Sequence, residues 1–219
     1  LATRLGLGGV PVAAETIALH TIFALMRSTK ARVHLCRISS AEGVELVRAA
    51  KKEGLAVTAD VSINSLHLSD HDIGYFDSRA RVTPVLRQQR DRDALRAALA
   101  DGTIDVLVSD HTPVDVDAKA LPFAEAEAGA TGLELLLSLS LKWAIDSKVS
   151  LLRALDVLTS QPAKVLGKID GQSESMGQLH VGGVADLVVF DPTAQWHVTP
   201  DTLHSQGKHT RSEERRVGK

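Results

Sequence analysis

The residues that could do chemistry begin with an acidic residue placed directly after an apolar run. Residues 104–109 are mostly branched and apolar, which is typical of a buried strand, and Asp110 and His111 follow at once. A carboxylate in this place could hold a metal ion, act as a general base or cap a helix. The Ser109-Asp110-His111 pattern alone leaves these three roles open.

Three further positions follow strand-like runs in the same way. They are Arg37, residues 62–65 and residues 83–85. In a parallel α/β barrel, reactive side chains lie at the carboxyl ends of the strands. If the chain forms such a sheet, these positions and Asp110 therefore meet at one edge of it.

The single cysteine and the other histidines give weaker signals. Cys36 stands beside Arg37 without an evident base, so we expect a buried structural cysteine rather than a nucleophile. His34 has the opposite side-chain parity to Arg37, which predicts that it packs between strand and helix. His67 and His71 lie in a polar stretch and are expected to face solvent.

The elements that must position these residues alternate between helix and strand. Helices are predicted over residues 13–26, 41–53, 91–100, 133–146 and 151–158, and strands over residues 32–38, 55–61 and 104–109. Residues 81–86 could be another strand end, although Pro84 limits its hydrogen bonding, and a break is predicted at Gln161-Pro162. Short connections between alternating elements favour βα units and a parallel sheet. Residues 177–190 differ, because Gly-rich turns separate short apolar runs and predict a small β element.

The composition is that of a soluble globular protein with an aliphatic core. Hydrophobic residues make up 44% of the 219 residues, charged residues 24% and aromatic residues only 3%. A net charge of −2 gives no reason to expect nucleic acid or an anionic membrane as a partner. One cysteine excludes an intrachain disulfide and favours the cytoplasm, and no apolar run approaches the roughly 20 residues that span a bilayer.

The two ends of the chain suggest a fragment. The sequence lacks an initiator methionine and starts in the loop-like residues 5–11. Residues 211–219 form an abrupt charged run without periodicity, which predicts a disordered or foreign tail.

Several segments, in the right order, resemble motifs of the dihydroorotase family. Residues 101–113 resemble the segment in which a strand delivers Asp-His-Ala-Pro-His into the site, and residues 81–87 resemble a Val-Asn-Pro-Pro-Leu-Arg segment. Residues 33–40 resemble the His-Val-Ser-Ser strand, and residues 57–66 resemble Val-Thr-Pro-His-His-Leu. Two later segments also match, residues 159–167 and 177–192.

This resemblance implies an α/β fold. Residues 1–170 would form the C-terminal part of a (β/α)8 amidohydrolase barrel. Residues 171–210 would supply the C-terminal strands of a small β-domain that is built from both chain ends.

The resemblance also implies that metal ligands have been replaced. In active members zinc is held by early histidines and a modified lysine, which would precede this chain, and by two later histidines and an aspartate. The later histidines correspond to Arg37 and to Asn64 or its neighbour Ser65, and only Asp110 is retained. A guanidinium stays protonated and has no acceptor, and an amide oxygen is a poor zinc ligand. No metal is therefore expected at these positions.

Two substrate-site positions have changed as well. The substrate-contacting asparagine corresponds to Thr83, and the second histidine of the Asp-His-Ala-Pro-His segment corresponds to Val114. We expect Arg37 to occupy part of the former metal volume and to pair with Asp110, because an unpaired buried charge is costly. The alternative is that Arg37 extends to solvent.

Three functions remain open on the sequence. The leading one is a non-catalytic dihydroorotase-like protein, a kind known to assemble with the catalytic subunit of aspartate transcarbamoylase in homo- or hetero-oligomers. The second is an active zinc-dependent dihydroorotase, or another cyclic amidohydrolase such as an allantoinase or hydantoinase, with upstream ligands and Asp110. The third is a barrel that binds a small anion through Arg37 and Arg87 without catalysis.

Overall fold

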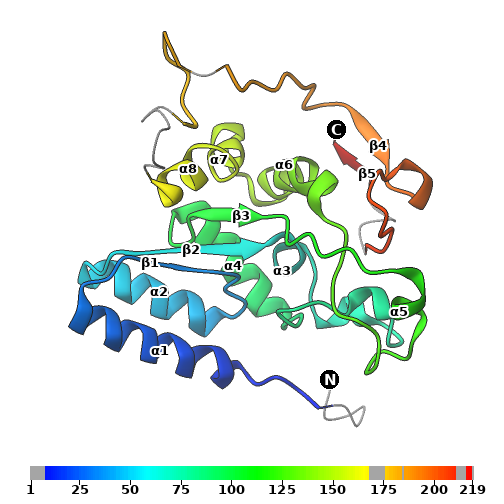
Figure 1. Cartoon of the computed structure of the whole chain (residues 1–219), viewed down its shortest axis with the longest axis horizontal. Helices are drawn as coiled ribbons and strands as arrows, with labels where there is room; N and C mark the ends of the chain where they lie inside the picture. The colour runs from blue at the N-terminus through cyan, green and yellow to red at the C-terminus, as the bar shows by residue number, and fades with distance from the viewer. Residues whose placement is uncertain (1–7, 168–175, 184, 211–215, 219) are drawn as a thin grey trace.

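The computed structural model describes residues 8–167, 176–183, 185–210 and 216–218 (Figure 1). Its α-helices are α1 (Val12–Thr29), α2 (Ala41–Glu53), α3 (Ile63–His67), α4 (Gln89–Asp101), α5 (Val116–Ala120), α6 (Leu136–Ser147), α7 (Leu151–Asp156) and α8 (Ser160–Leu166). Its strands are β1 (Val33–Leu35), β2 (Val57–Ser62), β3 (Val106–Val108), β4 (Gln195–His197) and β5 (Arg216–Gly218). Short 3-10 turns lie at Asp70–Ile73, Ser78–Ala80, Leu133–Leu135 and Pro200–Thr202.

Strands β1, β2 and β3 form a parallel sheet in that order. Helix α2 connects β1 to β2, and α3 and α4 connect β2 to β3, so the predicted βα units are confirmed. Helices α1 and α2 lie on the β1 side of the sheet, and α6, α7 and α8 lie beyond β3 (Figure 1). Because the strands are parallel and adjacent, their carboxyl ends meet at one edge.

Helix α2 spans the residues that the sequence predicts for it. The side chain of Ser40 accepts a hydrogen bond from the Gly43 amide at 3.0 Å, which satisfies one free donor of the first turn. Gly54 ends the helix with φ of 88°, a left-handed conformation that glycine adopts without steric cost. Both signals are local, which is why the sequence alone locates this helix.

The two faces of the sheet have different characters. Leu35, Ala59 and Val61 are buried and belong to the same apolar core as Val44 and Val47 of α2. Side chains alternate along a strand, so residues 34, 58 and 60 lie on the opposite face. The expectation that His34 packs between strand and helix is therefore wrong, because Leu35 holds that place.

Two other expectations about local structure are also wrong. Residues 81–86 form no strand, and Thr83-Pro84 is a cis peptide bond. The predicted break at Gln161-Pro162 falls inside α8, where Pro162 is the third helical residue. The first-turn amides of a helix have no partner within the helix, so a proline there removes no hydrogen bond.

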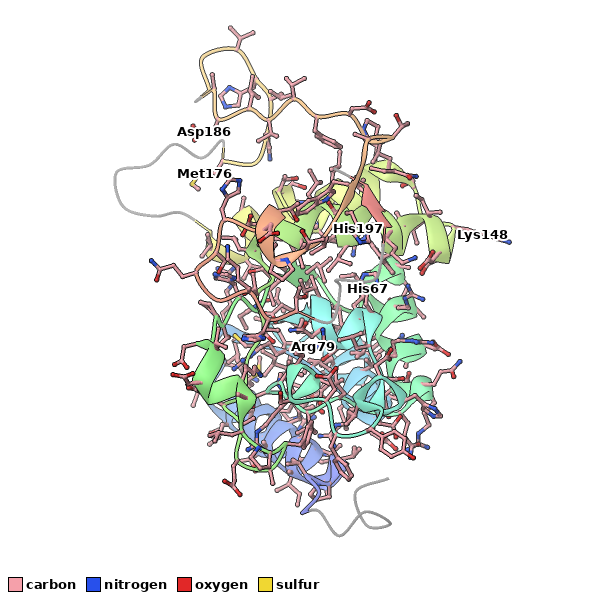
Figure 2. All side chains as sticks on the ribbon, turned by 90° about the vertical axis from the view of Figure 1, so that its right-hand side faces the viewer. His67, Arg79, Lys148, Met176, Asp186 and His197 are labelled. Carbon is pink, nitrogen blue, oxygen red and sulfur yellow. The ribbon has the colours of Figure 1, made fainter. Side chains whose placement is uncertain are left out.

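The predicted β element at residues 177–190 is not formed. Within residues 177–183 and 185–190 the backbone is irregular, and Val188 and Val189 are 81% and 99% exposed. Figure 2 shows Asp186 on a loop beyond the helices, whereas Gly177, next to Met176, lies against α8. A strand needs a neighbouring strand to satisfy its amides and carbonyls, and no described segment pairs with this one in a sheet. The proposed division at residue 170 stays a prediction.

The chain nevertheless has a second, smaller sheet near its end. Strand β4 pairs antiparallel with β5, and Trp196 stands opposite Val217. The run expected to be a disordered tail therefore contains a strand at residues 216–218, while residues 211–215 and 219 lie outside the described residues. Among the described residues, none of the helices combines the length and the apolar character that a membrane span needs.

Candidate functional site

The carboxyl edge of the parallel sheet carries an ion pair. Arg37 follows β1 by two residues and Asp110 follows β3 by two residues. Nη1 of Arg37 lies 3.1 Å from Oδ1 of Asp110, so the two side chains meet across the end of β2. The expected pair is present.

Both members of this pair have left-handed backbones. The φ angle is 59° at Arg37 and 48° at Asp110, a region that few residues other than glycine adopt. The amide of Arg37 donates to Oδ1 of Asp60 at 2.7 Å, which holds the turn after β1. Strained conformations of this kind persist when surrounding contacts define them, and they cluster at functional sites.

The turn after β3 is held by a close approach of the chain. A Cβ atom at Gly132 would lie 2.3 Å from the carbonyl oxygen of Ser109, so only glycine fits there. The ring nitrogen Nδ1 of His111 accepts from the amides of Gly132 and Leu133 at 3.2 and 3.3 Å. His111 therefore positions the backbone around Asp110 rather than reaching the ion pair itself.

The Asp110 carboxylate has both oxygens engaged. Its Oδ2 accepts from the Ser62 hydroxyl at 2.8 Å, and Oδ1 accepts from Arg37. The side chain of Asp110 is 9% exposed, whereas that of Arg37 is 42% exposed, so the carboxylate is the buried partner. Nη1 of Arg37 also donates to the Thr83 carbonyl at 3.1 Å. The guanidinium thus bridges the turn after β1, the loop around Thr83 and Asp110.

The other positions that correspond to ligand or substrate-site residues of the dihydroorotase motifs supply no imidazole or thiolate here. Asn64 lies half-buried in the first turn of α3, and its backbone amide donates to the Ser62 hydroxyl at 3.1 Å. Ser65 and Val114 are buried, and Thr83 contributes its carbonyl oxygen to Arg37. Zinc in proteins takes thiolate, imidazole or carboxylate ligands, commonly four. Of the positions compared, Asp110 alone has such a group, so these residues do not fit a zinc ion.

A second group of reactive side chains lies on the face of the sheet that carries residues 34, 58 and 60. His34 Nε2 is 3.0 Å from Asp60 Oδ2, and His34 Nδ1 is 2.8 Å from the Thr58 hydroxyl. Cys36 joins them, because one ligand atom from each of His34, Cys36 and Asp60 lies within 4.8 Å of the others. Sequence reasoning missed this group, although the two-residue spacing of His34 and Cys36 on a strand was a signal that they share a face.

The environment of Cys36 differs from the buried structural cysteine that was expected, since the residue is exposed. Partial burial of the thiol raises its pKa, and the negative charge of Asp60 and a hydrogen bond with it act in the same direction. The positive charge of Arg37 lowers the pKa of the thiol and is the smaller effect. In this state Cys36 is not an activated nucleophile.

His67 also differs from expectation. The residue is buried at the end of α3, and its Nε2 is 2.9 Å from the Leu139 carbonyl, so it joins α3 to α6. His71 is exposed, as expected for a residue in a polar turn.

A cavity of about 550 Å³ lies beside the loop that carries Thr83. Its lining is mainly apolar and includes the guanidinium-bearing residues Arg81, Arg87 and Arg90, but Arg37 is not part of it. The anion site that the sequence suggested, built from Arg37 and Arg87 together, is therefore not assembled in this cavity.

The arrangement of helices and strands matches solved amidohydrolase barrels. The L-hydantoinase (dihydropyrimidinase) of Arthrobacter aurescens superposes with a TM-score of 0.85 at 28% identity, over 94% of this chain and 46% of that one. The dihydropyrimidinase of Brevibacillus agri gives the same TM-score at 25% identity, and the match covers 46% of that protein. The expected fold, a part of a (β/α)8 amidohydrolase barrel, is confirmed.

Curated relatives have higher sequence identity. A dihydroorotase-like protein of Pseudomonas putida is 42% identical over 194 residues, which are 89% of this chain and 44% of that protein. A dihydroorotase of Desulfotalea psychrophila is 40% identical over 192 residues, 88% of this chain and 44% of that protein. The chain thus spans somewhat less than half the length of these two relatives. Residues 10–217 match the model of the amidohydrolase family, and the chain belongs to that family, in which its relatives include dihydroorotases and dihydroorotase-like proteins.

Proposed function

We propose that this chain belongs to a non-catalytic dihydroorotase-like protein of pyrimidine biosynthesis. The observation that carries the proposal is the Arg37 guanidinium bound to Asp110. An active amidohydrolase uses its metal to make bound water acidic and to polarise the carbonyl of the substrate. Here the guanidinium of Arg37 contacts the Asp110 carboxylate instead. Unlike a metal ion, a guanidinium cannot bind water as a Lewis acid.

The remaining contacts of Asp110 support the same conclusion. A general base must reach a proton on water or substrate, and the two oxygens of Asp110 already accept from Arg37 and Ser62. Neither Asn64 nor Thr83 supplies a replacement base, because an amide and a hydroxyl are not basic at neutral pH. The contacts of Asp110 with Arg37 and Ser62 therefore join the ends of the three strands, and we assign these residues a structural role.

For the whole protein we propose a supporting role in assembly. The partner that the family resemblance suggests is the catalytic subunit of aspartate transcarbamoylase, in a hetero-oligomer. A fold that is retained without its chemistry can still provide a surface for assembly.

Co-expression with a transcarbamoylase catalytic subunit tests this role. We expect the two proteins to co-elute in size-exclusion chromatography, and the transcarbamoylase subunit to lose activity when this protein is removed. Asp110→Asn is a matched control, because it changes the strand-end pair without altering the outer surface and should leave co-elution intact. Separate elution, together with full transcarbamoylase activity of the partner alone, would contradict the proposal.

A second candidate is an active dihydroorotase, and the similarity to relatives such as the dihydroorotase of Desulfotalea psychrophila favours it. In that case Asp110 would have to leave Arg37 and bind zinc together with ligands from other parts of the protein. Stoichiometric zinc that is lost in Asp110→Asn, together with turnover of dihydroorotate, would support this candidate over the first.

A further inference from the structure

We propose that His34, Cys36 and Asp60 form a binding site for a divalent cation that accepts sulfur and nitrogen ligands, with Zn²⁺ as the best fit. The site lies on the face of β1 and β2 that is opposite α2, and it is separate from the Arg37–Asp110 pair at the strand ends. It does not depend on whether the protein is catalytic.

The register of the two strands brings the three side chains together. His34 stands opposite Thr58 in the parallel pair, so residues 34, 36, 58 and 60 share one face. The ligand atoms of His34, Cys36 and Asp60 all lie within 4.8 Å of one another, and the His34–Asp60 distance is 3.0 Å. Ligands at about 2.0–2.3 Å from a tetrahedral zinc lie roughly 3.3–3.8 Å apart. Cys36 is the exposed member of the group, and a rotation of its side chain would have to close the remaining distance.

The hydrogen bonds around the group orient it for a cation. Metal-binding histidines usually have a hydrogen-bond partner on the ring nitrogen that does not touch the metal. Nδ1 of His34 has such a partner in the Thr58 hydroxyl at 2.8 Å, which leaves Nε2 directed at Asp60. Oδ1 of Asp60 accepts from the Arg37 amide at 2.7 Å, which leaves Oδ2 for the ion.

The charges at the site favour a cation. The side chain of Asp60 is 6% exposed, and among the described residues the His34 ring is its only salt-bridge partner. The nearby guanidinium of Arg37 is turned toward Asp110 and the Thr83 carbonyl, so its charge is largely compensated there. A divalent ion would supply the positive charge that Asp60 otherwise lacks and would favour the thiolate form of Cys36.

The donor set selects the kind of ion. One imidazole, one thiolate and one carboxylate suit zinc and similar transition metals, whereas Ca²⁺ and Mg²⁺ prefer oxygen ligands alone. Three protein ligands leave a fourth position for water. The ion would cross-link β1 and β2 directly below the strand ends.

Titration of the metal-free chain with Co²⁺ tests the site, because cobalt replaces zinc in such sites and reports its ligands by absorption. We expect a thiolate-to-cobalt charge-transfer band in the near ultraviolet, and competition by Zn²⁺. Cys36→Ser should abolish the band and weaken binding at least about 100-fold, since even the loss of a partner that orients a ligand costs about 10- to 100-fold. Thr58→Val, which removes only the hydroxyl that orients His34, should weaken binding by about tenfold.

Controls separate this site from others. His71→Gln changes an exposed histidine outside the group and should leave the titration unchanged. Asp110→Asn should also leave it unchanged, whereas it would abolish binding of an ion at the strand ends. Circular dichroism of Cys36→Ser checks the fold, which the exposed position of Cys36 should preserve.

The proposal is overturned if no thiolate band forms, or if cobalt binds equally well to Cys36→Ser. Its failure can be distinguished from failure of the proposed function. Turnover of dihydroorotate that requires Asp110 would contradict the non-catalytic role and leave this site standing, while absence of the band would remove this site and leave that role unaffected.

Discussion

Two groups of charged and polar side chains lie next to each other on the same strands, and they differ in where their positive charge comes from. At the strand ends the protein supplies its own cation, Arg37, which neutralises Asp110. On the sheet face, His34, Cys36 and Asp60 present three possible metal ligands, and within the described part of the chain none of them forms a salt bridge with a guanidinium or ammonium group. The comparison supports the proposal that Arg37 takes the place of a metal ion at Asp110, while the three donors on the sheet face remain available to one.

Asp60 connects the two groups, and its removal should have the largest effect. One of its oxygens accepts from the Arg37 amide and the other contacts His34, so Asp60→Ala releases the turn after β1 and a half-buried ring. We expect the free energy of unfolding to fall by about 3 kcal/mol, as measured by urea denaturation. The matched control is Asp93→Ala on α4, whose side chain is 54% exposed and whose loss should change stability little. If both substitutions lower the free energy of unfolding equally, Asp60 does not connect the two groups.

The difference between the groups should be reversible by restoring ligands at the strand ends. Arg37→His combined with Asn64→His would place two imidazoles near Asp110 and remove the competing guanidinium. In a Cys36→Ser background, which disables the sheet-face group, we expect zinc affinity to rise on the order of 100-fold, because two added ligands and a lost positive charge act together. Isothermal titration calorimetry measures the zinc affinity. The same gain after Asp110→Ala would show that the ion binds elsewhere.

Lys119 is a second positively charged side chain that differs from Arg37, because its partners are backbone carbonyls. Its Nζ donates to the carbonyls of Ser78, Arg81 and Glu127 at 3.1, 3.0 and 2.8 Å. Burial, reinforced by the positive charge of Arg81, lowers the pKa of Lys119 to about 8. Arg37, by contrast, has a carboxylate partner.

The lowered pKa of Lys119 gives a pH dependence of known sign. Between about pH 8 and the unfolded value of 10.5 the unfolded chain binds more protons than the folded one, so stability should increase as pH rises. One proton gives a slope of at most about 1.4 kcal/mol per pH unit. Urea denaturation across this range should show that Lys119→Met loses the increase and that Lys52→Met, at an exposed position, keeps it. An unchanged pH profile in Lys119→Met would contradict the assignment.

The smallest expected effect is the coupling within the strand-end pair itself. A double-mutant cycle with Arg37→Ala and Asp110→Ala should give about 1 kcal/mol, between the values typical of exposed and of buried pairs, because Arg37 is 42% exposed. The pair of Arg90 and Glu42, with side chains 64% and 48% exposed, is the matched control and should couple more weakly. If the coupling free energy of Arg37 and Asp110 is no larger than that of the control pair, the guanidinium does not take the place of a metal ion.

Local signals made much of the βα region predictable. Ser40 and Gly54 mark the ends of α2, and the β-branched runs before Ser62 and Ser109 mark two strands. The strand-end pair was predictable because the carboxyl ends of parallel strands must meet at one edge, whatever the details of packing.

The remainder depends on relationships between segments that a single sequence does not contain. The sheet-face group requires the register that places His34 opposite Thr58, and parity alone did not tell which face contacts α2. The apolar runs around Val188 have strand-like composition, but a strand forms only where a neighbour accepts its hydrogen bonds. Pro162 looked like a break because its place in the first turn of α8 depends on where that helix begins.

The most direct test of the central claim is hydrolysis of dihydroorotate by the purified intact protein, supplied with zinc and followed by loss of the cyclic substrate. Because Arg37 holds Asp110, and Asn64 and Thr83 carry no imidazole, thiolate or carboxylate, the rate should equal that of buffer containing the same zinc. Zinc-dependent ring opening that disappears in Asp110→Asn would contradict the claim that this site does no chemistry.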